Sequence, residues 1–110
     1  MKLSTLREAN VQRQIEWPGD DKTDLAFRAI EVFGEAGELA EAVKKFRRYE
    51  LGIAGSTSSI QDIKDEMGDV LIALDLLANH LGVTLEDCVS EKFNKTSEKY
   101  GFKTRLEPTQ

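Results

Sequence analysis

Apolar residues recur along this chain at intervals of three and four, and the alternation typical of β-strands is nearly absent, so the pattern predicts an all-α protein. The segment WPG at residues 17–19 and the Gly- and Ser-rich connector GIAGSTSS at residues 52–59 interrupt this pattern. Start and stop signals then divide the chain into four helices, expected at residues 5–16, 24–49, 58–82 and 84–100. We therefore expect a four-helix bundle.

Side-chain caps are predicted at three of the helix starts. A Thr5-x-x-Glu8 capping box opens the first helix, and a Ser58-x-x-Gln61 box opens the third. Thr84 is the expected cap of the fourth helix.

The template Glu-x-Gly-acid-aliphatic-x-x-Ala occurs twice, as EAGELAEA from residue 35 and EMGDVLIA from residue 66, on the second and third predicted helices. A turn of about 100° per residue places the acids on stripes that flank the core-facing arcs. These acids are Glu35, Glu38, Glu66 and Asp69. The predicted core arcs are Leu25, Val32, Ala36, Leu39, Ala40 and Val43 on the second helix, and Ile63, Met67, Val70, Leu74, Leu77 and Leu81 on the third.

Antiparallel packing of these two helices, which the short connector favours, brings the four carboxylates together at one depth of the bundle. Carboxylates so close resist ionisation unless a cation neutralises them, and all-oxygen ligation suits a hard cation, Mg²⁺ first and Mn²⁺ second. Gly37 and Gly68 each cost about 1 kcal/mol relative to alanine inside a helix, which indicates a close approach to the backbone there. The acids are thus predicted to form a metal site.

The acids have two alternative interpretations. Acids three residues apart are ordinary on solvated helix surfaces, so the non-enzymatic alternative is an acidic helical interaction module that meets basic residues of a partner. A di-iron carboxylate site needs Glu-x-x-His motifs, but Leu77 stands three residues before His80, the single histidine.

Composition bounds the class of protein. With 110 residues, 40% of them hydrophobic, the chain fits one domain (1–110), in which residues 1–22 form an N-terminal helix and loop and residues 102–110 a flexible tail. A net charge of −5 argues against nucleic acid as a partner, because that affinity depends on Lys and Arg. The single cysteine, Cys88, forms no internal disulfide, and neither a signal peptide nor a membrane helix is expected. The expected location is cytoplasmic.

The two acidic segments, 35–42 and 66–73, resemble the signature of the MazG-like, all-α NTP pyrophosphatase superfamily, which is Glu-x-x-Glu followed by Glu-x-x-Asp after a spacer. Here 27 residues separate Glu38 from Glu66. The flanking words GEAGELAEAVKK and DEMGDVLIALDLLA are also typical of the family, and the resemblance covers roughly residues 24–100. It implies a MazG-type helical bundle completed by oligomerisation, as a homodimer or a homotetramer.

The resemblance further implies Mg²⁺-dependent hydrolysis of a nucleoside triphosphate between the α and β phosphorus atoms, giving a monophosphate and pyrophosphate, often as house-cleaning of the nucleotide pool. Its catalytic and metal-binding residues would be Glu35, Glu38, Glu66 and Asp69. Many members carry a further Glu directly before the first motif acid, but Gly34 stands there in this sequence. Glu31, one turn earlier, is a candidate substitute.

Substrate-binding residues are expected on the last helix and near the first loop. Family members often show basic residues and a tyrosine on the last helix, which Lys92, Lys95 and Tyr100 match, whereas an asparagine common in some branches falls at Thr96. A solvated stripe explains these lysines equally well. Trp17 is a candidate to stack on a base, as aromatics near the first loop do in some relatives, with packing against the second helix as the alternative.

Overall fold

The computed structural model of the chain describes residues 1–107, in which no β-strand is present. Its elements are α1 (Leu3–Glu16), the short 3₁₀ helix η1 (Asp20–Lys22), α2 (Leu25–Leu51), α3 (Ile60–His80) and α4 (Leu85–Tyr100). The prediction of an all-α protein with four α-helices is confirmed. Within residues 1–107, no helix taken alone is long and apolar enough to cross a membrane, and only the bent pair of α3 and α4 passes by length and composition.

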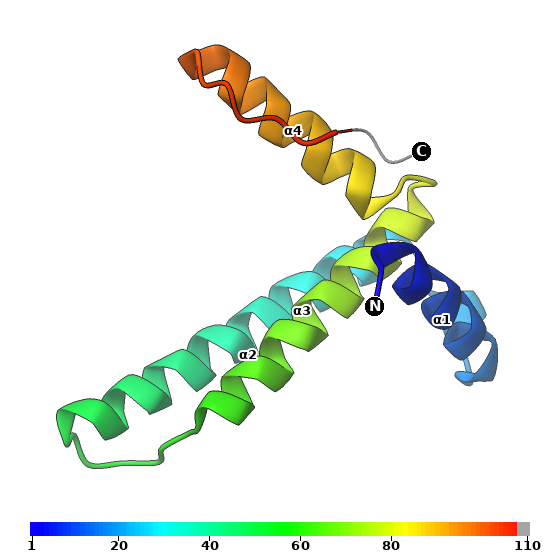
Figure 1. The fold of residues 1–110 in the computed structure, drawn as a ribbon. Helices are drawn as coiled ribbons and strands as arrows, with labels where there is room; N and C mark the ends of the chain where they lie inside the picture. The colour runs from blue at the N-terminus through cyan, green and yellow to red at the C-terminus, as the bar shows by residue number, and fades with distance from the viewer. Residues whose placement is uncertain (108–110) are drawn as a thin grey trace.

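Helices α2 and α3 lie side by side as a long antiparallel hairpin, which forms the body of the molecule (Figure 1). Asp24 caps α2, because its Oδ1 accepts a hydrogen bond from the N–H of Phe27 at 2.9 Å. The helix ends at Gly52, whose φ of 68° is a left-handed conformation that glycine adopts without strain. The chain then returns through the connector, so the two acidic words face each other across the hairpin.

The capping box of α3 lies one residue later than predicted. The side chain of Ser59 accepts from the N–H of Asp62, and the Asp62 carboxylate accepts from the N–H of Ser59. The predicted box of Ser58 and Gln61 is wrong because the Ser58 hydroxyl is already committed to the carbonyl of Ala42 in α2. Two possible capping boxes overlap in this segment, and the contact between Ser58 and Ala42 determines which of them forms.

The start of α1 also differs from the prediction. The helix begins at Leu3, and its N-cap, Lys2, has no side-chain capping bond, so the box predicted at Thr5 is wrong. Leu3 and Leu6 are both partly buried. Burial of apolar side chains, rather than a cap, stabilises this first turn.

Helix α4 turns away from the hairpin. The cap predicted at Thr84 is confirmed, since its hydroxyl accepts from the N–H of Asp87 at 3.2 Å. Between α3 and α4 the chain bends by 96°, and α4 projects from the end of the hairpin instead of lying along it (Figure 1). The segment after α4 runs back beside that helix, where the Asn94 side chain bonds both the N–H and the carbonyl of Leu106 at 2.8 Å. Residues 108–110 of the expected tail lie outside the described residues.

The open arrangement leaves much apolar surface uncovered. The radius of gyration is 17.2 Å, whereas a compact chain of this length has about 13 Å. The predicted core arcs are largely wrong for the single chain, since Leu25 is 46% exposed and Met67 is 58% exposed. The buried apolar residues are mostly small: Ala42, Ala73, Leu76, Ala78 and Leu85. The hairpin alone therefore encloses only a thin core.

Candidate metal centre and adjoining pocket

The antiparallel hairpin brings the four acids of the two words together. One carboxylate oxygen from each of them lies within 4.8 Å of the corresponding oxygens of the other three. These residues are Glu35 and Glu38 from α2, and Glu66 and Asp69 from α3. The duplicated spacing accounts for this convergence, because two Glu-x-x-acid steps on antiparallel helices reach the same depth from opposite directions.

The electrostatics of this cluster are unfavourable without a counter-charge. Burial, together with the charges of Glu38 and Asp69, raises the pKa of Glu35 above its ordinary value. The pKa of Glu66 is raised for the same reasons, burial first. Among the described residues, Oε2 of Glu35 and Oε2 of Glu66 are buried and have no hydrogen-bond partner. Two buried carboxylate oxygens without donors are a substantial cost to folding unless a cation satisfies them.

The donor set fits a hard divalent cation. All four donors are carboxylate oxygens, which suit Mg²⁺ or Mn²⁺, and the described residues bring no sulfur or imidazole into the cluster. The cluster is therefore compatible with a divalent metal ion.

Gly37 and Gly68, the glycines of the two acidic segments, face open space in the single chain. A Cβ atom placed at Gly37 or Gly68 has nothing within 4 Å among the described residues. No atom of the described chain makes the close approach, so that approach stays a prediction for a bound ligand or a second copy. What these glycines do contribute is a bare stretch of helix surface beside the second acid of each pair.

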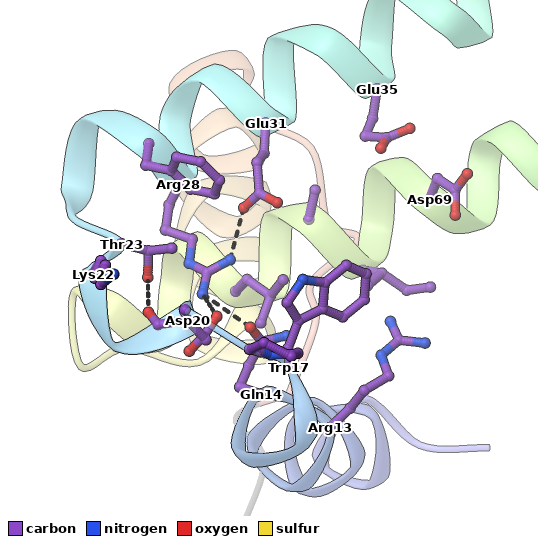
Figure 2. A pocket seen from close by; sticks show the side chains of 16 residues that line it. Arg13, Gln14, Trp17, Asp20, Lys22, Thr23, Arg28, Glu31, Glu35 and Asp69 are labelled. Carbon is purple, nitrogen blue, oxygen red and sulfur yellow. Dashed lines mark hydrogen bonds and ion pairs between the residues drawn. The ribbon is translucent and has the colours of Figure 1, made fainter.

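A pocket of about 480 Å³ adjoins the cluster on the side of Glu35 and Asp69. Half of its lining residues come from the segment 13–23, and the rest from α2 and α3. Trp17 extends its indole ring into this space, below the helices that carry the acids (Figure 2). Trp17 is 61% exposed, so much of its surface is accessible, and its stacking on a base stays a prediction.

Arg28 fixes the far wall of the pocket, and sequence reasoning missed it. Its guanidinium is buried and donates to Glu31 at 2.8 Å, to the Gln14 side chain at 3.0 Å, and to Asp20 (Figure 2). Burial opposes its charge, but the bonds to Glu31 and Asp20 prevail and raise the pKa of Arg28. One side chain thus joins α1, η1 and α2. The only sequence signal was an arginine on the acidic side of the helix, seven residues before Glu35.

Glu31 lines the same pocket as Glu35, on the same helix. One of its oxygens accepts the bond from Arg28, and its side chain is 34% exposed. The candidate substitute for the acid missing at Gly34 is thus partly engaged in holding the wall.

The substrate-binding candidates on α4 lie elsewhere. Lys92, Lys95 and Tyr100 do not line the pocket beside the acids, because α4 projects away from the hairpin. Lys92 instead borders an apolar groove of about 680 Å³ between α3 and α4. The Tyr100 ring stacks on Phe102 with ring centroids 5.9 Å apart. A single chain therefore does not bring these three residues to the acidic cluster.

The fold and the site together define an all-α protein with a carboxylate cluster suited to a divalent cation. A family model for the MazG nucleotide pyrophosphohydrolase domain matches residues 28–101. The chain is 32% identical over 87 residues to the gene 37 protein of Mycobacterium phage L5, covering 76% of this chain and 75% of that protein. It is 36% identical over 73 residues to the uncharacterized protein YvdC of Bacillus subtilis (strain 168), covering 60% of this chain and 66% of that protein. The chain belongs to the MazG nucleotide pyrophosphohydrolase family.

Proposed function

We propose that this protein is a Mg²⁺-dependent nucleoside triphosphate pyrophosphohydrolase that converts a (d)NTP to the (d)NMP and pyrophosphate. The observation that carries the proposal is the cluster of four carboxylates, two of which bury an oxygen without a hydrogen-bond partner in the described part of the chain. The family membership supplies the reaction class. House-cleaning of the nucleotide pool in the cytoplasm is the proposed role.

In this proposal the four acids hold the metal, and the adjoining pocket holds the nucleoside. Bound Mg²⁺ would offset the negative charge of the phosphates and lower the pKa of an attacking water. Glu35 and Asp69 belong to both the cluster and the pocket, so they set the boundary between the phosphates and the nucleoside. Trp17 offers a flat apolar surface for a base, and the bonds of Arg28 hold the wall around it.

A homo-oligomer is part of the same proposal. The hairpin leaves large apolar side chains exposed, and a chain of this size gains stability by covering them with a second copy. Because α4 projects away from the acids of its own chain, a substrate contact by Lys92, Lys95 or Tyr100 requires that second copy. The proposal therefore assigns these residues to a site shared between protomers.

The test is a panel of ribo- and deoxyribonucleoside triphosphates with Mg²⁺ or Mn²⁺, assayed for pyrophosphate and monophosphate release. We expect at least one triphosphate to be hydrolysed, with activity abolished by EDTA and lowered about a hundredfold in Glu38→Gln, since that variant loses one ligand of the cluster. No release from any triphosphate would favour the acidic interaction module. Equal turnover by Glu38→Gln would remove the cluster from the reaction.

A further inference from the structure

Three cationic side chains line the pocket beside the acidic cluster: Arg13, Lys22 and Arg28. The guanidinium of Arg28 is committed to three acceptors in the pocket wall. Lys22 lies at the end of the pocket away from the acids (Figure 2). Arg13 therefore differs from both, because it lies on the side of Asp69 and its guanidinium has no hydrogen bond or ion pair with any of residues 1–107.

The position of Arg13 is set by the end of α1. It lies in the last turn of that helix, four residues before Trp17 at the C-cap, and both side chains line the pocket. The guanidinium points toward α3 and the edge of the acidic cluster, beside the indole ring (Figure 2). The helix dipole favours a cation in this turn, but it does not account for a side chain that extends into the pocket.

Charge decides what Arg13 can bind there. Glu35 and Asp69 lie at the end of the cluster that borders the pocket. A divalent cation held by the cluster would neutralise the negative charge of these two carboxylates. A phosphate placed between the cluster and the indole ring would meet the cation on one side. On its other side, toward the pocket, it needs a hydrogen-bond donor. A guanidinium suits phosphate oxygens because it offers two parallel N–H bonds.

We propose that Arg13 binds the phosphate that remains attached to the nucleoside, so that the pocket recognises a nucleoside monophosphate unit and not the base alone. This inference rests on the proposed function. Arg13 lies outside residues 28–101, the part that the family model matches, so the family does not assign it a role. Substrate selection in this chain would then depend on its N-terminal helix as well as on the family domain.

The experiment measures binding of dAMP, dCMP, dGMP and dTMP, of the matching deoxynucleosides, and of pyrophosphate to the full chain in Mg²⁺. Isothermal titration gives each Kd, and the fluorescence of Trp17, the single tryptophan, gives a second readout. For Arg13→Met we expect the Kd of the best monophosphate to rise about ten- to hundredfold, as for a lost charge-assisted hydrogen bond, with nucleoside and pyrophosphate binding unchanged. Arg13→Lys keeps the charge without the paired donors and should fall between the two.

Lys22→Met is the matched control, because it removes a cation from the same pocket at the end away from the acids. An equal loss in Lys22→Met would overturn the proposal in favour of general charge attraction. Equal weakening of nucleoside and monophosphate would also overturn it, as would weaker pyrophosphate binding alone or no monophosphate binding to the unaltered protein. The two proposals can fail separately. If monophosphate binding depends on Arg13 but no triphosphate is hydrolysed, the binding site is supported and the proposed function is wrong.

Discussion

Arg7 and Asp75, 68 positions apart in the sequence, form an ion pair that joins α1 to α3, with the Nε of Arg7 at 3.1 and 3.2 Å from the two carboxylate oxygens. Asp75 is only 1% exposed, and Asn10 donates to its Oδ2 at 2.9 Å. Arg7 also donates to the carbonyl of Val83, just before α4. A buried charge thus ties α1 to the hairpin, and α1 leads directly into the segment 13–23 that supplies half of the pocket lining.

Replacement of Asp75 by alanine is expected to destabilise the protein by about 3 kcal/mol, because Arg7 loses the partner of its charge and the buried Asn10 keeps only the carbonyl of Ile72, at 3.3 Å. Urea unfolding followed by circular dichroism measures the change. The exposed pair of Arg47 and Glu50 provides the control, and Glu50→Ala should cost less than about 1 kcal/mol. Equal costs for the two variants would show that the buried pair has no special part in stability.

The acidic cluster was predictable from the sequence because its signal is local and repeated. Each helix carries a complete Glu-x-x-acid word, and antiparallel packing follows from the short connector. Arg28 and Asp75 were not predictable in this way. Each is a single polar residue whose partners lie on other elements, so no spacing within one helix marks it.

The fold, too, was predictable only where the sequence signal is local. Helix existence and type follow from periodicity, whereas the place of α4 depends on a bend between helices that periodicity does not encode. The core arcs were wrong for a related reason: hydrophobic spacing identifies a face that seeks burial, but not whether the same chain or another copy covers it. Met67 and Leu25 are exposed in this chain although both lie on such faces.

Magnesium is expected to stabilise the protein against heat. Since the unfolded chain holds no preformed cluster, a concentration one hundred times Kd should add about 2.7 kcal/mol, seen as a rise in Tm. Glu38→Gln should lose most of this gain, whereas Glu50→Gln, an acid on the same helix outside the cluster, should keep it. A Tm that does not respond to millimolar Mg²⁺ or Mn²⁺ would rule out the proposed metal centre.

The carboxylate of Asp62 is expected to make the stability of the start of α3 sensitive to acid. The hydrogen bonds from Ser59 lower the pKa of Asp62, with a smaller contribution from the charge of Lys45 on α2. A lowered pKa in the folded state means that the stabilisation is present above about pH 4, the unfolded value, and is lost as the pH falls through the folded value.

Asp62→Asn should therefore lower Tm at pH 7, and the difference from the unaltered protein should shrink as the pH falls below about 4. Thermal melts across this pH range measure it. Asp65→Asn is the control, since among residues 1–107 the Asp65 carboxylate accepts a bond from the Gln61 side chain alone, and it should change Tm less at pH 7. A difference between Asp62→Asn and the unaltered protein that stays constant with pH would contradict the role of the carboxylate.

The apolar groove between α3 and α4 predicts how the chain associates. It is lined by Leu77, Leu81, Val89 and Phe93, with Phe102 at its edge, and Phe93 is 41% exposed. A charged side chain there would have to be desolvated in an interface, so Phe93→Asp should shift a dimer or tetramer toward monomer at micromolar concentration. Light scattering coupled to size exclusion measures the mass, and Glu86→Lys, at the polar start of α4, serves as the control for a charge change on that helix.

Because Lys92 borders the same groove, loss of association in Phe93→Asp should also lower triphosphate turnover at low protein concentration, and turnover should recover at high protein concentration. A protein that is already monomeric before substitution would show that the exposed faces of α2, α3 and α4 are not covered by a second copy.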